Sequence, residues 1–214
     1  MGYTRRTLII LLLALSLLLA VLVTSFTYCW IGLNFFAGGF SKPVSSGERQ
    51  LRLGVVAEAK THLGVVEGSS GHQQILDIYN THTPLARDYE VQLSDNWCAT
   101  YGSAIAVSQG LTQIIPTECG CERQIELWKE MGNWTENGAH LPLPGDYIYY
   151  NWDHTWNFKD NDGWADHVGI VVGSFGPAIK VIEGNRSDMV TYRILFRWDY
   201  RIRGYGLPDY ASIG

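Results

Sequence analysis

One cysteine stands where the sequence would build a reactive thiol. Cys98 follows Asp95, a good N-cap residue, and a helix from Asp95 to about Gly110 would place Cys98 in its first turn. Unpaired backbone N–H groups and the positive end of the helix macrodipole stabilise a thiolate at that position. Most free cysteines are instead inert, buried small side chains. The position nevertheless makes Cys98 a candidate nucleophile.

A histidine with a suitable position for a general base opens a strand-like run, His167–Gly173. Side chains alternate between the faces of a strand, so His167 and Gly169 share a face and the imidazole has open space in front of it. That space would admit a substrate and a facing thiolate. The alternative is an ordinary hydrogen-bonded surface histidine.

The next expected strand, Ile179–Glu183, ends in two groups that could orient an imidazole, Glu183 and Asn185. Period-two alternation places both on one face, with Gly184 between them. If the two strands pair as a hairpin, either group could accept a hydrogen bond from Nδ1–H of His167 and leave Nε2 facing the sulfur. A thiol, a base and an orienting group together make an activated nucleophile.

The elements that must position these side chains follow an α+β order, with helices first and short antiparallel strands afterwards. Ser45 and Glu48 indicate a capping box for a helix that Gly64 closes. A helical turn is expected near Gln73–Tyr79 and a helix near Cys121–Met131. Small residues on the early face of the Asp95 helix would let a sheet approach closely: Ala99, Gly102, Ser103 and Ala106. The expected strands are Asp146–Trp152, His167–Gly173, Ile179–Glu183 and Val190–Trp198.

The first part of the chain predicts a membrane anchor. No charged residue occurs between Arg6 and Lys42, and the apolar run exceeds the about 20 residues that span a bilayer. Arg5 and Arg6 would keep the N-terminal side cytoplasmic and place the rest outside. A cleaved signal peptide, and so a secreted protein, is the alternative, although no small-x-small site follows Val23. The expected parts are stub and anchor at 1–36, linker at 37–47 and a globular domain at 48–214.

The composition argues against several kinds of partner. A net charge of −5 offers no clustered basic surface, so no nucleic acid is expected. The histidines are not at metal-ligand spacing, and neither a metal nor a cofactor is expected. One acidic loop is either solvated or a calcium site, but it does not fit the EF-hand pattern; it contains Asp153, Asp160, Asp162 and Asp166. The sequence does not indicate an oligomeric state.

The cysteine count also favours a working thiol. Cys29 lies in or beside the apolar run, which leaves three cysteines in the globular part. An odd extracellular cysteine is either an intermolecular bridge or a reactive thiol. Cys119 and Cys121 are separated by one glycine and form either a strained disulfide or two free thiols. Cys121 also begins a helix and is therefore a rival nucleophile.

Four segments in order resemble the CHAP family, the cysteine- and histidine-dependent amidohydrolases and peptidases found largely in bacterial and phage cell-wall hydrolases. They are Asp95–Ser103, Pro144–Ile148, Asp166–Val171 and Val181–Asn185. The resemblance covers about Glu48 to Asp209 and implies a papain-like fold, with N-terminal helices packed on an antiparallel sheet. It also implies cleavage of peptidoglycan amide bonds, with Cys98 as nucleophile, His167 as base, and Glu183 and Asn185 orienting the imidazole.

The resemblance has one departure, because Trp97 stands where many members carry a glutamine before the nucleophile. Gln92, six positions ahead of Cys98, is an oxyanion-hole candidate, and the backbone N–H of Cys98 could supply one donor in any case. Substrate-binding candidates are Trp97, Trp152 and Trp164; together with Trp156, the last two could form a platform for sugar or peptide, although at least one is expected in the core.

We therefore expect a membrane-anchored, extracytoplasmic peptidoglycan hydrolase, either an N-acetylmuramoyl-L-alanine amidase or an endopeptidase. It would sit in the cell membrane through a single span. Two other functions compete: a papain-like protein peptidase or acyl transferase, and a catalytically idle wall-binding module. The intact set of Cys98, His167 and Glu183-Gly184-Asn185 disfavours the idle module, since binding alone requires none of these residues.

Overall fold

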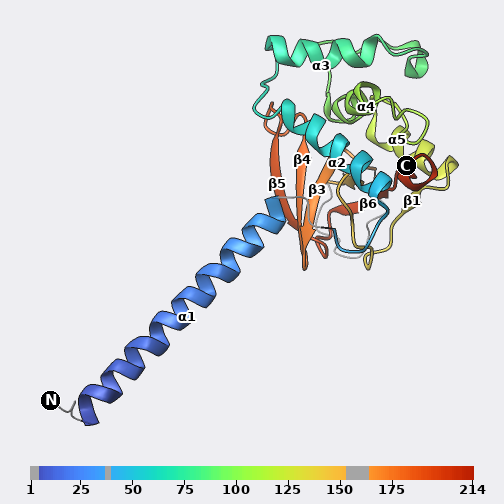
Figure 1. The fold of residues 1–214 in the computed structure, drawn as a ribbon. Helices are drawn as coiled ribbons and strands as arrows, with labels where there is room; N and C mark the ends of the chain where they lie inside the picture. The colour runs from blue at the N-terminus through green and yellow to red at the C-terminus, as the bar shows by residue number, and fades with distance from the viewer. Residues whose placement is uncertain (1–4, 37–39, 153–163) are drawn as a thin grey trace.

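The computed structural model describes residues 5–36, 40–152 and 164–214, and within the first helix the side chains of residues 12–28. Figure 1 shows one long helix, α1 (Arg5–Phe36), extending from a folded unit in which helices pack with a β-sheet. The other helices are α2 (Ser46–Thr61), α3 (Ser70–Asn80), α4 (Cys98–Ser108) and α5 (Cys121–Glu130). Short 3₁₀ turns lie at Ala86–Asp88 and Tyr210–Ser212. The α+β fold expected from the sequence is confirmed.

The sheet has six antiparallel strands in the order β1-β6-β2-β3-β4-β5. The strands are β1 (Trp134–Thr135), β2 (Tyr147–Tyr150), β3 (His167–Phe175), β4 (Ala178–Glu183), β5 (Thr191–Phe196) and β6 (Ile202–Gly206). The expected hairpin is present: β3 pairs with β4, and Ile170 lies opposite Ile182. This pairing brings the end of β4 beside the start of β3.

Two strands, β1 and β6, were not expected from the sequence. β6 contains two glycines in five residues, a composition that disfavours strand. Packing requires at least one of them, because a Cβ on Gly206 would lie 2.3 Å from the Trp128 ring. β6 is buried throughout and occupies the place between β1 and β2. Tertiary packing therefore overrides local propensity here.

α2 and α5 agree with the sequence predictions, whereas α3 differs from them. Ser45 Oγ accepts the backbone N–H of Glu48 at 3.0 Å and starts α2, as the capping box predicts. α5 lies where it was expected. α3 is a complete helix capped by Ser69, whereas the sequence indicated only a turn near Gln73–Tyr79. Its residues carry no glycine or proline after Gly71 that would end it early.

α4 begins at Cys98 rather than at Asp95. The carboxylate of Asp95 accepts the backbone N–H of Gln92 at 2.8 Å and the hydroxyl of Tyr89 at 2.7 Å. It therefore stabilises the preceding turn instead of capping the helix. Trp97 occupies the N-cap position without a side-chain hydrogen bond to the helix. Cys98 is consequently the first helical residue.

The small residues of α4 allow the close approach to the sheet that the sequence indicated. A Cβ on Gly102 would lie 2.9 Å from the Tyr147 ring of β2. The Tyr147 hydroxyl donates to the backbone carbonyl of Gly102 at 2.8 Å. The helix is buried from Cys98 to Ala106. This packing holds the N-terminus of α4 close to the sheet.

Several expectations fall outside what the structure describes or remain predictions. Among the described residues, no helix combines the length and hydropathy that a membrane crossing needs. Three aspartates of the acidic loop, Asp153, Asp160 and Asp162, lie outside the described residues, as does Trp156. Within the described ranges, no group of three His, Cys, Asp or Glu side chains is arranged to hold a metal ion.

Candidate active site

The sulfur of Cys98 lies at the N-terminus of α4 and is only slightly accessible, with 6% of the residue exposed. It interacts with the backbone N–H of Ala99, one of the first-turn donors that lack a helical partner. The backbone carbonyl of Asp166 lies 3.9 Å away. The helix start therefore supplies the polar environment in which a thiolate is stable.

His167, the first residue of β3, faces Cys98 from the sheet. The imidazole and the thiol interact directly, and the ring stacks on Tyr150 with 6.1 Å between centroids. Burial alone would lower the pKa of His167, but Cys98 and Glu183 raise it to about 9. Hydrogen bonds from Cys121 and His167 hold the pKa of the Cys98 thiol well below its ordinary value, although burial opposes them. Both shifts favour the charged pair, a thiolate at Cys98 beside an imidazolium at His167.

Glu183 orients the imidazole from the end of β4. Its carboxylate is fully buried, and Oε2 lies 3.2 Å from Nε2 of His167. The sequence reasoning assigned this contact to Nδ1, so that assignment is corrected: Nε2 faces Glu183, which leaves Nδ1 for the sulfur. Burial favours the protonated carboxyl, but His167 and Arg193 keep the pKa of Glu183 below its ordinary value.

The space beside Gly169 is filled rather than open. A Cβ there would lie 2.4 Å from Cγ1 of Val181 and 2.7 Å from Cγ of Glu183. The glycine therefore makes room for the orienting side chain, not for a substrate. The expectation of open space in front of this strand face is corrected accordingly.

Arg193 on β5 is a member of the site that the sequence reasoning missed. Its Nε donates to both carboxylate oxygens of Glu183, at 2.6 Å and 2.9 Å. β5 pairs with β4 so that Arg193 lies opposite Val181, diagonally from Glu183. A charged residue between Tyr192 and Ile194 in a strand was the available signal. The interacting series therefore runs from Cys98 through His167 and Glu183 to Arg193.

Asn185 is not brought to His167. β4 ends at Glu183, so the strand alternation that placed the amide beside the carboxylate does not extend to Asn185. Asn185 has φ +56°, and its Nδ2 donates to Oδ1 of Asn96 at 3.4 Å. The left-handed backbone turns its side chain toward the segment before Cys98. Gly184 lets the turn pack closely, since a Cβ there would lie 2.6 Å from Tyr101.

Two other candidates have different roles from those expected. The side-chain amide of Gln92 donates to the backbone carbonyl of Glu90 at 2.8 Å, and the residue is exposed. It is therefore not aimed at Cys98 as an oxyanion donor would be. Trp97 is fully buried, its ring lies tilted against that of His72 with 4.5 Å between centroids, and its Nε1 donates to Glu67 at 3.0 Å. It is a core residue and cannot contact a substrate.

The remaining tryptophans differ in their accessibility. Trp152 is half-buried between two guanidinium groups, with Arg193 at 4.2 Å and Arg201 at 4.4 Å from its ring. It supports the arginine that holds Glu183. Trp164 is 71% exposed and precedes His167 by three residues. Of the three proposed tryptophans, Trp164 is the one free to contact a substrate.

The cysteines of the folded unit are all free thiols: Cys98, Cys119 and Cys121. No disulfide joins Cys119 to Cys121, which settles the alternative left open by their spacing. Cys121 begins α5 and lies with its sulfur 3.6 Å from that of Cys98. Contact with Cys98, together with burial, raises the pKa of Cys121 well above its ordinary value. It is therefore a poor nucleophile beside a good one.

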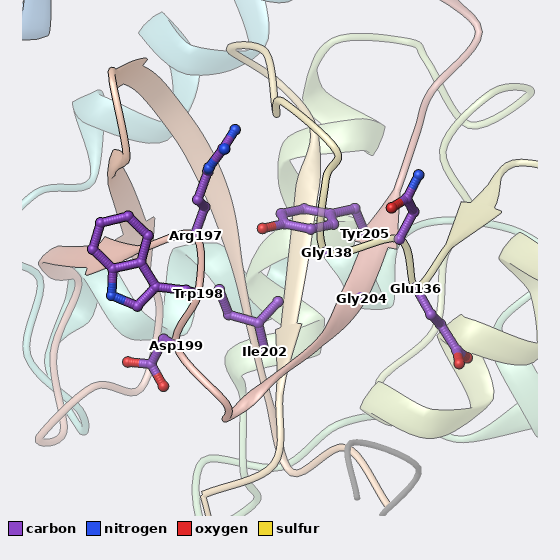
Figure 2. A pocket seen from close by; sticks show the side chains of 9 residues that line it. Glu136, Gly138, Arg197, Trp198, Asp199, Ile202, Gly204 and Tyr205 are labelled. Atoms are coloured by element: carbon purple, nitrogen blue, oxygen red, sulfur yellow. The ribbon is translucent and has the colours of Figure 1, made fainter. Parts of the chain in front are cut away.

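A pocket on another part of the sheet is separate from these residues. Figure 2 shows that it lies beside β6, between Glu136 and Trp198, with the Tyr205 ring in its wall. We call Cys98, Cys121, His167, Glu183 and Arg193 the Cys98 cluster. None of the residues that line this pocket belongs to it.

Comparisons with known proteins identify no family. No family model matches the chain, and no curated protein is significantly similar to it. Among solved structures, "The crystal structure of Ly7917" aligns with a TM-score of 0.40 and 12% sequence identity. The alignment covers 73% of this chain and 62% of that chain. A likeness this distant supports no argument about fold or function.

Proposed function

We propose that this protein is a CHAP-like cysteine amidohydrolase that cleaves amide bonds of peptidoglycan from a position tethered to the membrane. The observation that carries the proposal is the connected chain from Cys98 at a helix N-terminus to His167 and the buried carboxylate of Glu183. A binding module needs no such arrangement. The order of helices followed by an antiparallel sheet is compatible with a papain-like fold.

The reaction begins with the thiolate of Cys98 attacking the carbonyl carbon of the amide. The imidazolium of His167 gives a proton to the departing amine, and a thioester remains on the sulfur. Water then attacks the thioester with His167 as its base. Glu183 holds the ring through Nε2 in both steps, so that Nδ1 exchanges the proton.

Developing negative charge on the carbonyl oxygen needs donors near Cys98. The backbone N–H of Cys98 belongs to the first turn of α4, where N–H groups lack helical partners. The side chain of Gln92 is turned away. The proposal therefore assigns the oxyanion contact to the helix start rather than to a glutamine side chain.

The tether rests on the sequence of residues 1–36. α1 is one continuous helix, and its described side chains are exposed and mostly apolar, including Leu17, Leu19 and Phe26. With Arg5 and Arg6 on the cytoplasmic side, the folded unit would face the wall. Protease added to intact cells should digest the folded unit, and carbonate washing should leave the full-length chain with the membranes. Release of the full-length chain into the medium would contradict the tether.

Digestion of purified peptidoglycan by the full-length protein tests the reaction. We expect new muropeptides in mass spectrometry, whose termini identify the bond: free L-alanine amine for an amidase, or a cut stem or cross-bridge for an endopeptidase. Cys98→Ala should abolish the products, whereas Cys119→Ala, a cysteine outside the cluster, should retain them. Equal release by Cys98→Ala would overturn the proposal. Cleavage of a protein panel without any new muropeptide would favour a protein peptidase or acyl transferase.

A further inference from the structure

Cys121 forms no bond to the substrate in the proposed reaction, but it lies against the nucleophile. The two sulfurs are 3.6 Å apart, and each cysteine is the first residue of its helix, Cys98 of α4 and Cys121 of α5. Both residues are buried, at 6% and 8% exposure. A disulfide has an S–S length of about 2.0 Å, so the sulfurs need to approach by only about 1.6 Å.

The two thiols differ in the way that disulfide chemistry needs. Hydrogen bonds with Cys121 and His167 hold the pKa of Cys98 well below its ordinary value, so Cys98 is the more acidic thiol of the pair. Cys121 keeps its proton, because a second negative charge beside Cys98 is unfavourable in a buried position. A thiolate reacts with oxidants, and a neighbouring protonated thiol resolves the product.

We propose that Cys98 and Cys121 form a reversible disulfide when the protein meets a hydroperoxide, which makes this pair a modification site that switches off the nucleophile. The disulfide itself follows from the thiol geometry alone, whereas its effect on hydrolysis rests on the proposed function.

The chemistry needs only the hydroperoxide as oxidant. The Cys98 thiolate attacks one peroxide oxygen; an S–O bond forms, the O–O bond breaks, and the departing oxygen takes a proton from the His167 imidazolium to leave as water when the oxidant is hydrogen peroxide. Cys98 is then a sulfenic acid. The Cys121 sulfur attacks the Cys98 sulfur; an S–S bond forms, the S–O bond breaks, and the thiol proton leaves with the oxygen as a second water. Two electrons pass from the sulfurs to the peroxide.

Cys119 provides an internal comparison. Its sulfur lies 3.1 Å from Nη2 of Arg87 and 3.4 Å from Oε1 of Glu118, in a different cluster. Burial raises the pKa of the Cys119 thiol, so it lacks the reactivity of Cys98. It is two residues from Cys121 in sequence, but its interactions direct it away from the Cys98 pair.

The test uses the full-length chain with Cys29→Ser, purified in detergent and exposed to hydrogen peroxide. Remaining thiols are alkylated, and the protein is digested without reduction for peptide mass spectrometry. We expect a linked peptide pair joining Cys98 to Cys121, with Cys119 alkylated, and recovery of both free thiols after dithiothreitol. Hydrolysis of peptidoglycan should fall at least tenfold on oxidation and return on reduction.

Two variants sharpen the result. Cys119→Ser should behave like the parent, whereas Cys121→Ser should give no link and leave Cys98 as sulfinic acid, with activity that dithiothreitol does not restore. The mapping of the parent protein needs neither variant, so a misfolded Cys121→Ser does not weaken the test. A Cys119–Cys121 link, or sulfinic acid at Cys98 with Cys121 alkylated in the parent, would overturn the inference. A correct link in a protein that never cleaves peptidoglycan would instead overturn the proposed function.

Discussion

The Nε–H group of Arg193 donates hydrogen bonds to both carboxylate oxygens of Glu183, at 2.6 Å and 2.9 Å. Glu183 is fully buried, so the arginine supplies the positive charge that keeps this carboxylate ionised on the side away from His167. The imidazole is thus oriented by a group that is itself held in place.

Replacing Arg193 by glutamine should destabilise the protein and change its pH dependence. Removing one of the cations that pair with the buried Glu183 should cost about 2 kcal/mol, measurable by urea denaturation, because His167 and Arg186 remain beside the carboxylate. The pKa of Glu183 is depressed in the folded protein, so its contribution to stability is present at neutral pH and is lost as the pH falls through the folded value. In Arg193→Gln that loss should begin at higher pH, and the acid limb of kcat/KM should move upward with it.

Arg193→Lys is the matched control, because it keeps the charge and should recover part of both effects. An unchanged acid limb in Arg193→Gln, with stability alone reduced, would show that Arg193 acts only in packing.

The imidazolium of His167 predicts an alkaline limit to activity. Its pKa is raised from 6.5 to about 9, so the charged ring contributes stability that is complete below pH 6.5 and is lost as the pH rises through about 9. In the proposed reaction the leaving amine takes its proton from this ring, so kcat/KM should fall above pH 9. Glu183→Gln removes one cause of the raised pKa and should move the alkaline limb toward 6.5. A wild-type limb already at 6.5 would contradict the ion pair.

Gly169→Ala should reduce activity by displacing Glu183, the residue that orients His167. The added methyl would overlap Val181 and Glu183, and overpacking of this kind costs about 1–3 kcal/mol. Glu183 must shift, so kcat should fall by about 100-fold, as misplaced catalytic groups commonly cause. Gly138→Ala is the control, since a Cβ there meets nothing within 4 Å. Equal activity of the two variants would rule out a positioning role for the Gly169 space.

Gln92→Ala distinguishes two origins of oxyanion stabilisation. Loss of a true oxyanion donor costs about 100-fold or more in kcat. Because the Gln92 amide is bonded to the Glu90 carbonyl, we expect kcat within twofold of wild type. A 100-fold loss with unchanged thermal stability would mean that Gln92 turns toward the substrate during catalysis.

The sequence was informative where a local signal and the fold agree. The capping box at Ser45, the β3–β4 hairpin and the small face of α4 were all predictable, because each depends on neighbours in sequence or on strand alternation. The proximity of Cys98, His167 and Glu183 followed from the hairpin together with one helix start.

The rest depended on contacts between distant segments. Asp95 resembles a helix cap but bonds to Tyr89 and Gln92 instead, and Trp97 fills a core cavity beside His72. Arg193 carries no motif, since its role comes from a diagonal across the β4–β5 pair. The nearness of Cys121 to Cys98 requires two helix starts to converge, which no local pattern encodes.

The place of β6 also determines when the sheet can be completed during synthesis. All residues of the Cys98 cluster precede β6 along the chain, yet this strand lies inside the sheet, between β1 and β2. In a nascent chain that already carries Cys98, His167, Glu183 and Arg193, β2 can pair with β3 but still lacks its second neighbour, β6. Such non-local pairings form late in folding. If the proposed hydrolase activity requires the complete sheet, we expect it to appear only after β6 has been synthesised.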